Sequence, residues 1–298
     1  MTLAALFDVP APAKLNLFLH VIGRRPDGYH LLQSAFVLID WSDTLHFERR
    51  GDGQLHRHDL GAALPADDLC MQAARLLQAE SVTPFGVDIS IDKRLPSSAG
   101  LGGGSSDAAT TLLALNRLWG LGWSRARLLA MAARLGADVP FFVGGDNAFV
   151  EGIGEQLTPI AIPRHLFAIV KPAAGLATEL IFKQPSLVRD TPAAILSGFL
   201  AEAAKARGTD RPAYLSAYGR NDLQPPAEAC CPDIVLAAQW LNSHFGNSRM
   251  TGSGSAMFAR NGMDDQPLAT WPAEPLPPGW VGRMCCSLVQ HPLRGWAG

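Results

Sequence analysis

The sequence predicts an α+β protein of two domains, the first over residues 1–160 and the second over residues 161–298. Three observations support this prediction. The chain has 298 residues, which is more than one typical domain contains. Within the first half, alternating apolar and polar residues that indicate strands give way to apolar patterns of helical period. A proline-rich segment at residues 158–163 then precedes a new strand pattern at residues 166–172.

The composition excludes several classes of function. The chain has 25 basic and 27 acidic residues, and this balance gives no general attraction to nucleic acid or to anionic membranes. No apolar run reaches the ~18–20 residues that span a bilayer, and the N-terminus lacks the basic start of a secretory signal. The cysteine count is odd, at five, without CxxC spacing, which indicates reduced thiols and a cytoplasmic protein. The composition thus indicates neither a nucleic-acid nor a membrane partner. Independently of the composition, we expect a small-molecule substrate and a monomer or homodimer.

The first strand is predicted at residues 11–22, where the odd-numbered residues from Leu15 onward are apolar. Lys14 and Asn16 share the opposite face with Phe18, so this face is also expected to be partly buried. Lys14 then has two interpretations. Its stem could cover apolar surface near the strand end while the ammonium reaches water, or the ammonium could point at a phosphate or at a reacting hydroxyl.

A hairpin turn is predicted at Asp27-Gly28, before a long strand at residues 31–47 that is broken near residues 41–43. Tyr29 and His30 follow the turn. They could pack against the end of the hairpin, or they could offer a flat face and hydrogen bonds to a heterocycle.

Residues 48–64 are polar and contain three glycines, which indicates an irregular connection. Residues 66–77 then predict a helix whose first turn is acidic and includes Asp68. The alternation at residues 87–92 predicts a strand that ends just before Lys93.

The segment from Pro96 to Ala109 joins this strand to a helix and has four glycines in five residues, followed by Ser105 and Ser106. The first amides of a helix lack partners, and glycines let the backbone approach an anion closely. We therefore expect phosphate binding, with the serines capping the helix or donating to a phosphate or its metal ion. The alternative is a flexible turn before a capped helix. The segment is neither a Walker A loop, because no Lys-Ser or Lys-Thr follows, nor a good dinucleotide fingerprint.

Asp138 follows a helix predicted at residues 124–135, between the cap Ser124 and the stop at Gly136. The residue precedes Val139-Pro140, so it could simply cap a short helix. It could also face a cleft, because one position can serve both purposes.

The second half is predicted to contain a strand at residues 166–172, helical structure within residues 186–220, a helix at residues 234–245, a second glycine loop at residues 249–256 with a following strand, and a last strand at residues 282–290. Five prolines in residues 264–279 predict that any helix there is short or broken.

The glycine loop resembles the Pro-x-x-x-Gly-Leu-Gly-Ser-Ser-Ala motif of the GHMP kinases. Its version here, Gly-Leu-Gly-Gly-Gly-Ser-Ser-Asp-Ala-Ala, is similar to that of the branch whose members phosphorylate 4-diphosphocytidyl-2-C-methyl-D-erythritol. Pro-Ala-Lys-Leu-Asn, Arg-x-Asp-Gly-Tyr-His, Gly-Ala-Asp-Val-Pro and the second glycine loop resemble the same branch. The resemblance implies an N-terminal domain like that of ribosomal protein S5, a ferredoxin-like C-terminal domain and an active site in the cleft between them.

The resemblance further implies ATP- and Mg²⁺-dependent phosphorylation of the substrate's 2-hydroxyl, in non-mevalonate isoprenoid precursor biosynthesis. Asp138 would orient or deprotonate that hydroxyl, Lys14 would stabilise developing charge, and Mg²⁺ would lie near Ser105 or Ser106. The residues implied to bind ATP and its phosphates are Asp68, Lys93, Pro96, Ser97, Ser98, Ala99, Gly100, Leu101, Gly102, Gly103, Gly104, Ser105 and Ser106. Those implied to bind the cytidylyl substrate are Asn16, Tyr29, His30, Thr178 and Phe182.

Two departures and two alternatives accompany this resemblance. Asp68 and Gln224 stand where relatives often have asparagine and glutamate, and an ionised Asp68 only accepts hydrogen bonds. One alternative is another GHMP kinase, of the homoserine or mevalonate type, which Asp-Gly-Tyr-His disfavours. The other is a nucleotide-binding module without catalysis, which the presence of both Lys14 and Asp138 does not favour.

Overall fold

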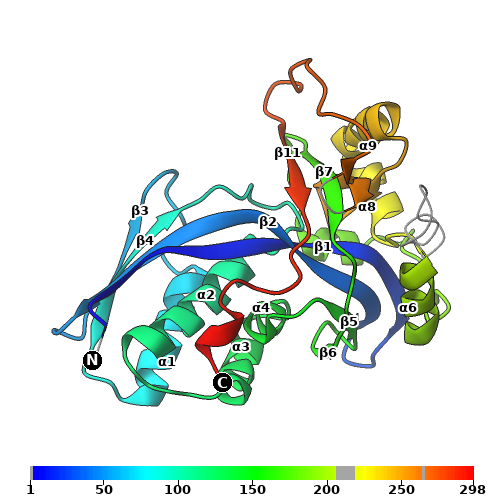
Figure 1. The fold of residues 1–298 in the computed structure, drawn as a ribbon. Helices are drawn as coiled ribbons and strands as arrows, with labels where there is room; N and C mark the ends of the chain where they lie inside the picture. Colours follow the sequence, from blue (N-terminus) through cyan, green and yellow to red (C-terminus); the bar gives the residue numbers. More distant parts are fainter. Residues whose placement is uncertain (1–2, 206–218, 264–265) are drawn as a thin grey trace.

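The computed structural model describes residues 3–205, 219–263 and 266–298. A long antiparallel hairpin of β1 (Ala5–Arg24) and β2 (His30–Arg50) runs through the molecule (Figure 1). The predicted turn is confirmed, because Gly28 has φ +92° and the Tyr29 amide donates to Asp27 Oδ1 at 3.2 Å. The predicted break near residues 41–43 is wrong, since β2 is continuous there. At the same place, however, the pairing with β1 is irregular, because the register shifts between the pairs Pro12–Ser42 and Lys14–Leu38.

The first sheet has six strands in the order β3-β4-β2-β5-β6, with β1 paired to β2. The added strands are β3 (Leu55–Asp59), β4 (Gly86–Asp92), β5 (Ala148–Glu151) and β6 (Gln156–Pro159). β3 pairs in parallel with β4 and corrects the prediction of an irregular connection at residues 48–64. Its sequence, Leu-His-Arg-His-Asp, is too polar to show the apolar alternation of a strand.

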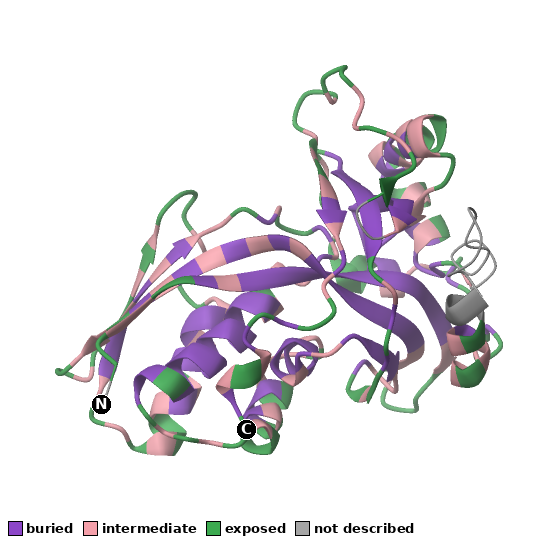
Figure 2. Ribbon diagram, in the orientation of Figure 1, coloured by how far each residue is buried: buried purple, intermediate pink, exposed green. Residues whose placement is uncertain are grey.

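Four helices cover one face of this sheet: α1 (Leu69–Ser81), α2 (Gly103–Leu118), α3 (Arg125–Leu135) and α4 (Val139–Gly144) (Figure 1). The prediction that Asp68 lies in the first turn of this helix is wrong, because α1 begins at Leu69; Asp68 is its N-cap, and the carboxylate accepts from the Met71 amide. Ser124 caps α3 as predicted. Nearly all of α2 is buried (Figure 2), which the run of alanine, threonine and leucine after its first turn explains.

The second sheet is antiparallel, with the order β10-β9-β7-β11 and β8 paired to β9. Its strands are β7 (His165–Lys171), β8 (Arg249–Met250), β9 (Met257–Met263), β10 (Gln266–Pro267) and β11 (Val281–Cys286). The accompanying helices are α5 (Thr178–Phe182), α6 (Leu196–Lys205), α8 (Gln224–Cys230) and α9 (Pro232–Phe245). A short 3-10 turn near the C-terminus, η2 (Arg294–Trp296), packs instead against the helices of the first sheet.

The predictions for the second half are confirmed for β7, α9 and the strand after the second glycine loop. The helical structure expected in residues 186–220 is present as α6, and residues 206–218 lie outside the described residues. The described part of residues 264–279 contains no helix, as its prolines predict. β11 ends at Cys286, four residues earlier than predicted.

The buried apolar residues form three clusters, and β1 contributes to all of them. Val9 packs in the cluster under α1–α4, Leu15 in a cluster that also contains Phe149 and Phe167, and Val21 in a cluster beneath α8 and α9. The middle cluster joins residues of both sheets. Both faces of β1 are therefore buried, and its polar side chains lie where the two sheets meet. Among the described residues, no helix is long and apolar enough to cross a membrane.

Candidate active site

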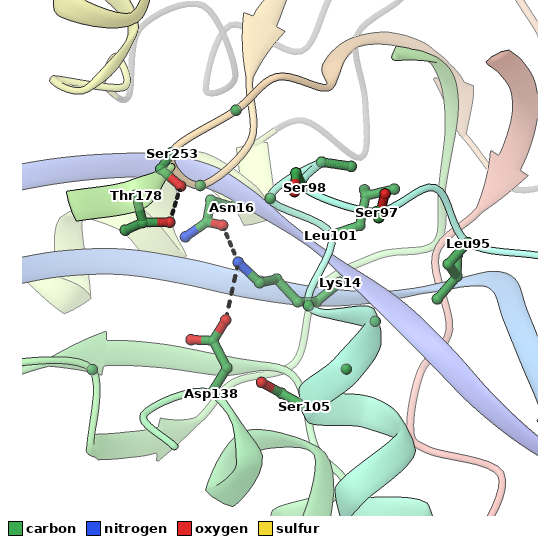
Figure 3. Close-up of a pocket in the computed structure, with 18 of the residues that line it drawn as sticks. Lys14, Asn16, Leu95, Ser97, Ser98, Leu101, Ser105, Asp138, Thr178 and Ser253 are labelled. Carbon is green, nitrogen blue, oxygen red and sulfur yellow. Dashed lines mark hydrogen bonds and ion pairs between the residues drawn. The ribbon is translucent and has the colours of Figure 1, made fainter. Parts of the chain in front are cut away.

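A cavity of about 680 Å³ opens where elements of both sheets meet. Its wall is formed by β1, residues 95–105, Asp138, α5 and the second glycine loop. Figure 3 shows Lys14 at its centre, with Asn16 on one side and Asp138 on the other. The cavity contains both predicted catalytic residues and every predicted ATP-binding residue except Ser106. Of the predicted substrate-binding residues, Asn16, Thr178 and Phe182 line it, whereas Tyr29 and His30 do not.

Lys14 is held in one place by its neighbours. Its side chain is almost fully buried, and its Nζ donates to Asn16 Oδ1 at 2.5 Å, lies 3.6 Å from Asp138 Oδ2 and sits 4.6 Å from the ring centroid of Phe36. Asn16 is fixed in turn, because its Nδ2 donates to Ser34 Oγ at 2.9 Å. A buried ammonium with these partners is a positioned cation and not a lysine that reaches water.

Asp138 precedes α4 at the N-cap position, but its carboxylate makes no capping hydrogen bond. The Asp138 side chain is 31% exposed and faces Lys14 across the cavity wall (Figure 3). The proline in the first turn of α4 needs no capping partner for its nitrogen. The carboxylate therefore remains available to a ligand in the cavity.

The glycine loop is held by main-chain contacts on both sides. The Lys14 amide donates to the Leu101 carbonyl at 3.0 Å, which ties the loop to β1. Amides of the second glycine loop, at Ser255 and Ala256, donate to carbonyls of Ser98 and Ala99, each at 3.2 Å. The second glycine loop therefore packs beside the first, and Gly103 and Gly104 at the start of α2 line the cavity.

Two glycines of the loop have left-handed backbone conformations and close neighbours. Gly100 and Gly102 both have φ +73°. A Cβ atom at Gly100 would lie 2.2 Å from the Thr251 carbonyl oxygen, and one at Gly102 would lie 3.2 Å from Lys14 Cγ. The loop can therefore approach both the second glycine loop and Lys14 only because these positions carry no side chain.

Gly100→Ala is expected to lower the free energy of unfolding by roughly 2 kcal/mol or more, because the new methyl group adds backbone strain and a clash. Urea denaturation measures this change. The matched control is Gly51→Ala, where no atom lies within 4 Å of the new Cβ, and its effect is expected within about 0.5 kcal/mol. Equal stability of the two variants would contradict the close contact.

The two serines after the glycines have different environments. α2 begins at Gly103 with Gly102 as N-cap, so the prediction that Ser105 or Ser106 caps the helix is wrong. Ser106 is fully buried, and its Oγ donates to the Pro12 carbonyl at 2.7 Å, which ties α2 to β1. Ser105 lines the cavity, so only this serine remains a candidate phosphate or metal ligand.

Lys93 lies between two carboxylates that the sequence did not single out. Its ammonium contacts Asp43 and lies 2.7 Å from Asp107 Oδ2. Asp43 also accepts the amides of Arg94 at 2.6 Å and Leu95 at 2.8 Å, which anchors the entry to the glycine loop. Burial raises the pKa of Asp107, as does Asp43, while Lys93 opposes the shift. In the sequence, the available indication was that Asp107 directly precedes the apolar run of α2.

Asp68, at the same end of the cavity, already has partners. Its Oδ1 accepts from the Met71 amide at 3.0 Å and lies 2.9 Å from Arg57 Nη1. Arg57 also pairs with Asp59 at 2.7 Å. The Asp68 carboxylate therefore links β3 to α1. The sequence analysis did not predict this contact because it did not predict β3.

The opposite end of the cavity contains Thr178 and Phe182. Thr178 Oγ1 and Ser253 Oγ are 2.6 Å apart and both line the wall (Figure 3). The Phe182 ring stacks on His30, with centroids 5.0 Å apart and planes at 27°. Tyr29 is 60% exposed and lies outside the cavity.

The second glycine loop is fixed by a segment whose role the sequence left open. Asn221 Nδ2 donates to the carbonyls of Met250 at 2.8 Å and Gly252 at 2.7 Å. Gln224 Oε1 accepts the Met250 amide at 2.9 Å, and its amide group donates to Glu228 at 2.7 Å. Gln224 thus supplies an acceptor, as a glutamate would.

Comparisons with known proteins agree with this site. The model of the GHMP kinases N terminal domain matches residues 68–146. A protein of Methylibium petroleiphilum, named 4-diphosphocytidyl-2-C-methyl-D-erythritol kinase, is 62% identical over 100% of both chains. One of the same name from Variovorax paradoxus is 54% identical over 98% of this chain and 99% of the relative.

Solved structures show the same relationship. The crystal structure of a 4-(cytidine 5'-diphospho)-2C-methyl-D-erythritol kinase matches with a TM-score of 0.71 and 34% identity, over 85% of this chain and 89% of that one. A homoserine kinase from Cytophaga hutchinsonii, 16% identical with a TM-score of 0.63 over 97% of this chain and 96% of that one, shares the fold.

The fold, the glycine loop at the start of α2 and the cavity define a small-molecule kinase of the GHMP class. Within that class, the full-length similarity shows that the chain belongs to the 4-diphosphocytidyl-2-C-methyl-D-erythritol kinase family.

Proposed function

We propose that the protein transfers the γ-phosphoryl group of ATP to the 2-hydroxyl of 4-diphosphocytidyl-2-C-methyl-D-erythritol. The observation that supports this most directly is the lysine–carboxylate pair, with Lys14 Nζ 3.6 Å from Asp138 Oδ2, beside a glycine loop that begins a buried helix. Phosphoryl transfer needs alignment and charge stabilisation more than covalent chemistry. The cavity contains both the lysine–carboxylate pair and the main-chain amides of the glycine loop, close to one another.

In this proposal Asp138 orients the acceptor hydroxyl and takes its proton. Lys14, fixed by Asn16, holds its positive charge next to the transferred group and stabilises the charge that develops there. The amides of residues 100–105 and the N-terminus of α2 bind the β- and γ-phosphates. Lys93 and Asp68 line the end of the cavity that would hold the rest of the nucleotide.

A magnesium ion would fit this site only if substrate phosphates and water supplied most of its ligands. Among the described residues there is no group of three or more His, Cys, Asp or Glu side chains that could hold a metal ion. Mg²⁺ in such enzymes commonly binds substrate phosphates, water and one or two protein oxygens. Ser105 is the cavity-lining residue that would hold it together with the phosphates and water, and the ion would offset phosphate charge.

The substrate's cytosine would lie against Phe182, with Thr178 and Ser253 near its phosphates. Asn16 would contact the methylerythritol part beside Lys14. His30 would support the Phe182 ring by stacking on it. Tyr29 would contact the base only if its exposed side chain moved to the cavity.

The division at residue 160 also remains a proposal. Every strand up to Pro159 belongs to the first sheet and every strand from His165 onward to the second, which supports a nucleotide-binding unit of residues 1–160 and a second unit of residues 161–298. The five cysteines are free thiols, which supports a reducing, cytoplasmic location.

A coupled ADP-release assay with a panel of alcohols tests the function. The cytidylyl substrate is expected to support turnover, whereas homoserine and mevalonate are not. Turnover with homoserine or mevalonate alone would favour another GHMP kinase activity. ATP binding without ADP release from any alcohol would favour a module without catalysis.

The two serines of the loop are expected to respond differently to replacement by alanine. Ser105→Ala should raise the KM for ATP several-fold with little change in stability, because its hydroxyl faces the cavity. Ser106→Ala should lower the free energy of unfolding by about 1–3 kcal/mol, because it leaves the buried Pro12 carbonyl without its partner. Kinetics and urea denaturation of both variants check this, and the reverse pattern would contradict the assignment.

A further inference from the structure

Arg189 is a residue beside the base-binding wall for which the sequence suggested no role. Its Nε donates to His30 Nε2 at 3.1 Å, and its Nη2 donates to the carbonyls of Phe182 at 3.1 Å and Gln184 at 3.0 Å. Its Nη1 donates to the Leu187 carbonyl at 2.9 Å. One guanidinium thus binds the first residue of β2 and three main-chain carbonyls at or after the end of α5.

These contacts determine the state of His30. An arginine Nε always donates, so His30 Nε2 must accept, and a neutral ring then carries its proton on Nδ1. Burial lowers the pKa of His30, and the charges of Arg189 and Arg24 lower it further. His30 is therefore a neutral imidazole in one tautomer.

The position of His30 makes this tautomer relevant to the wall. The Phe182 ring lines the cavity and the His30 ring does not, yet the two rings are stacked. His30 consequently forms a second layer behind Phe182. Arg189 does not line the cavity either, and its hydrogen bonds direct the guanidinium at this second layer and at the end of α5.

We propose that Arg189 is a positioning residue for the base-binding wall: it fixes the ring plane of Phe182 by holding His30 and the loop after α5 in one arrangement. The flat heterocycle of the substrate then stacks on a ring whose orientation is already determined, so binding orders fewer groups. The inference rests on the proposed function, since it assumes a substrate that carries a base.

Kinetics of Arg189→Gln and Arg189→Lys test this inference. We expect Arg189→Gln to raise the KM for the cytidylyl substrate about tenfold, with kcat and the KM for ATP changed less than about threefold. Arg189→Lys should remain impaired, because a point charge cannot replace a planar fork that binds four acceptors. The matched control is Arg134→Gln, which removes an exposed arginine paired with Glu80 on another part of the molecule.

The tautomer of His30 provides a readout apart from activity. Nitrogen-15 NMR should show the His30 proton on Nδ1 in the wild-type protein and a mixture of tautomers in Arg189→Gln, with His30→Gln used to assign the signal. The inference would be overturned if the KM for the cytidylyl substrate and the His30 chemical shifts were both unchanged. It would also be overturned if kcat and the affinities for both substrates were impaired equally and the melting temperature fell. Wild-type protein that does not turn over the cytidylyl substrate would contradict the proposed function itself, and this inference with it.

Discussion

Asp138→Asn is expected to lower kcat by about 10²-fold or more, the size of the loss when a positioned acid–base group is removed. The amide has nearly the same shape as the carboxylate but cannot take the proton of the acceptor hydroxyl. Because Asp138 makes no capping hydrogen bond and is 31% exposed, the free energy of unfolding should change by less than about 1 kcal/mol. Steady-state ADP release and urea denaturation of the same preparations measure both quantities.

The control for this variant is Asp67→Asn, which removes an exposed carboxylate that pairs with Arg75 on the surface. It should retain wild-type turnover. If folded Asp138→Asn turned over substrate at nearly the wild-type rate, Asp138 could not be the base, and the cavity would need another acceptor for the proton.

Lys14→Met should also lower kcat by about 10²-fold or more, through a different physical cause. Methionine has a similar length, but it removes the charge that lies 4.6 Å from the Phe36 ring centroid and beside Asp138. Asn16 Oδ1 then loses the shorter of its two hydrogen bonds and keeps the one from Thr251 Oγ1 at 3.3 Å. The matched control is Lys183→Met, an exposed lysine paired with Glu179, which should leave turnover unchanged.

The double variant Lys14→Met/Asp138→Asn separates two explanations. Residues that act as one unit show strongly non-additive losses, so the double variant should be no more than about threefold slower than the slower single variant. Losses that multiply would instead mean that the two side chains act independently. That outcome would contradict a lysine–carboxylate pair serving a single step.

Patterns within short stretches were sufficient for much of the fold. The Asp27-Gly28 turn, the Ser124 cap and the strand–glycine loop–helix order are determined by neighbouring residues, because turn and cap preferences are local. β3 was missed because His56 and His58, two of its five residues, are polar and exposed and give no apolar alternation. Its place in the sheet depends instead on pairing with β4.

The site shows the same division. The family motifs pointed to Lys14, Asp138 and the cavity-lining part of the glycine loop. Asp43, Asp107 and Arg189 were not identified, because each acts on a residue far away in the sequence. Ser106 was assigned to phosphate binding, yet the approach of α2 to β1 turns its hydroxyl toward Pro12.

The sequence by itself determined the order of the strands and helices along most of the chain, the glycine loop that joins a strand to a buried helix, and the two residues expected to do the chemistry. Only the tertiary structure decided which serine faces the cavity, which carboxylates surround Lys93 and how the base-binding wall is supported. The physical reason is that hydrogen bonds and ion pairs between distant segments depend on how the sheets and helices pack, which no local pattern records.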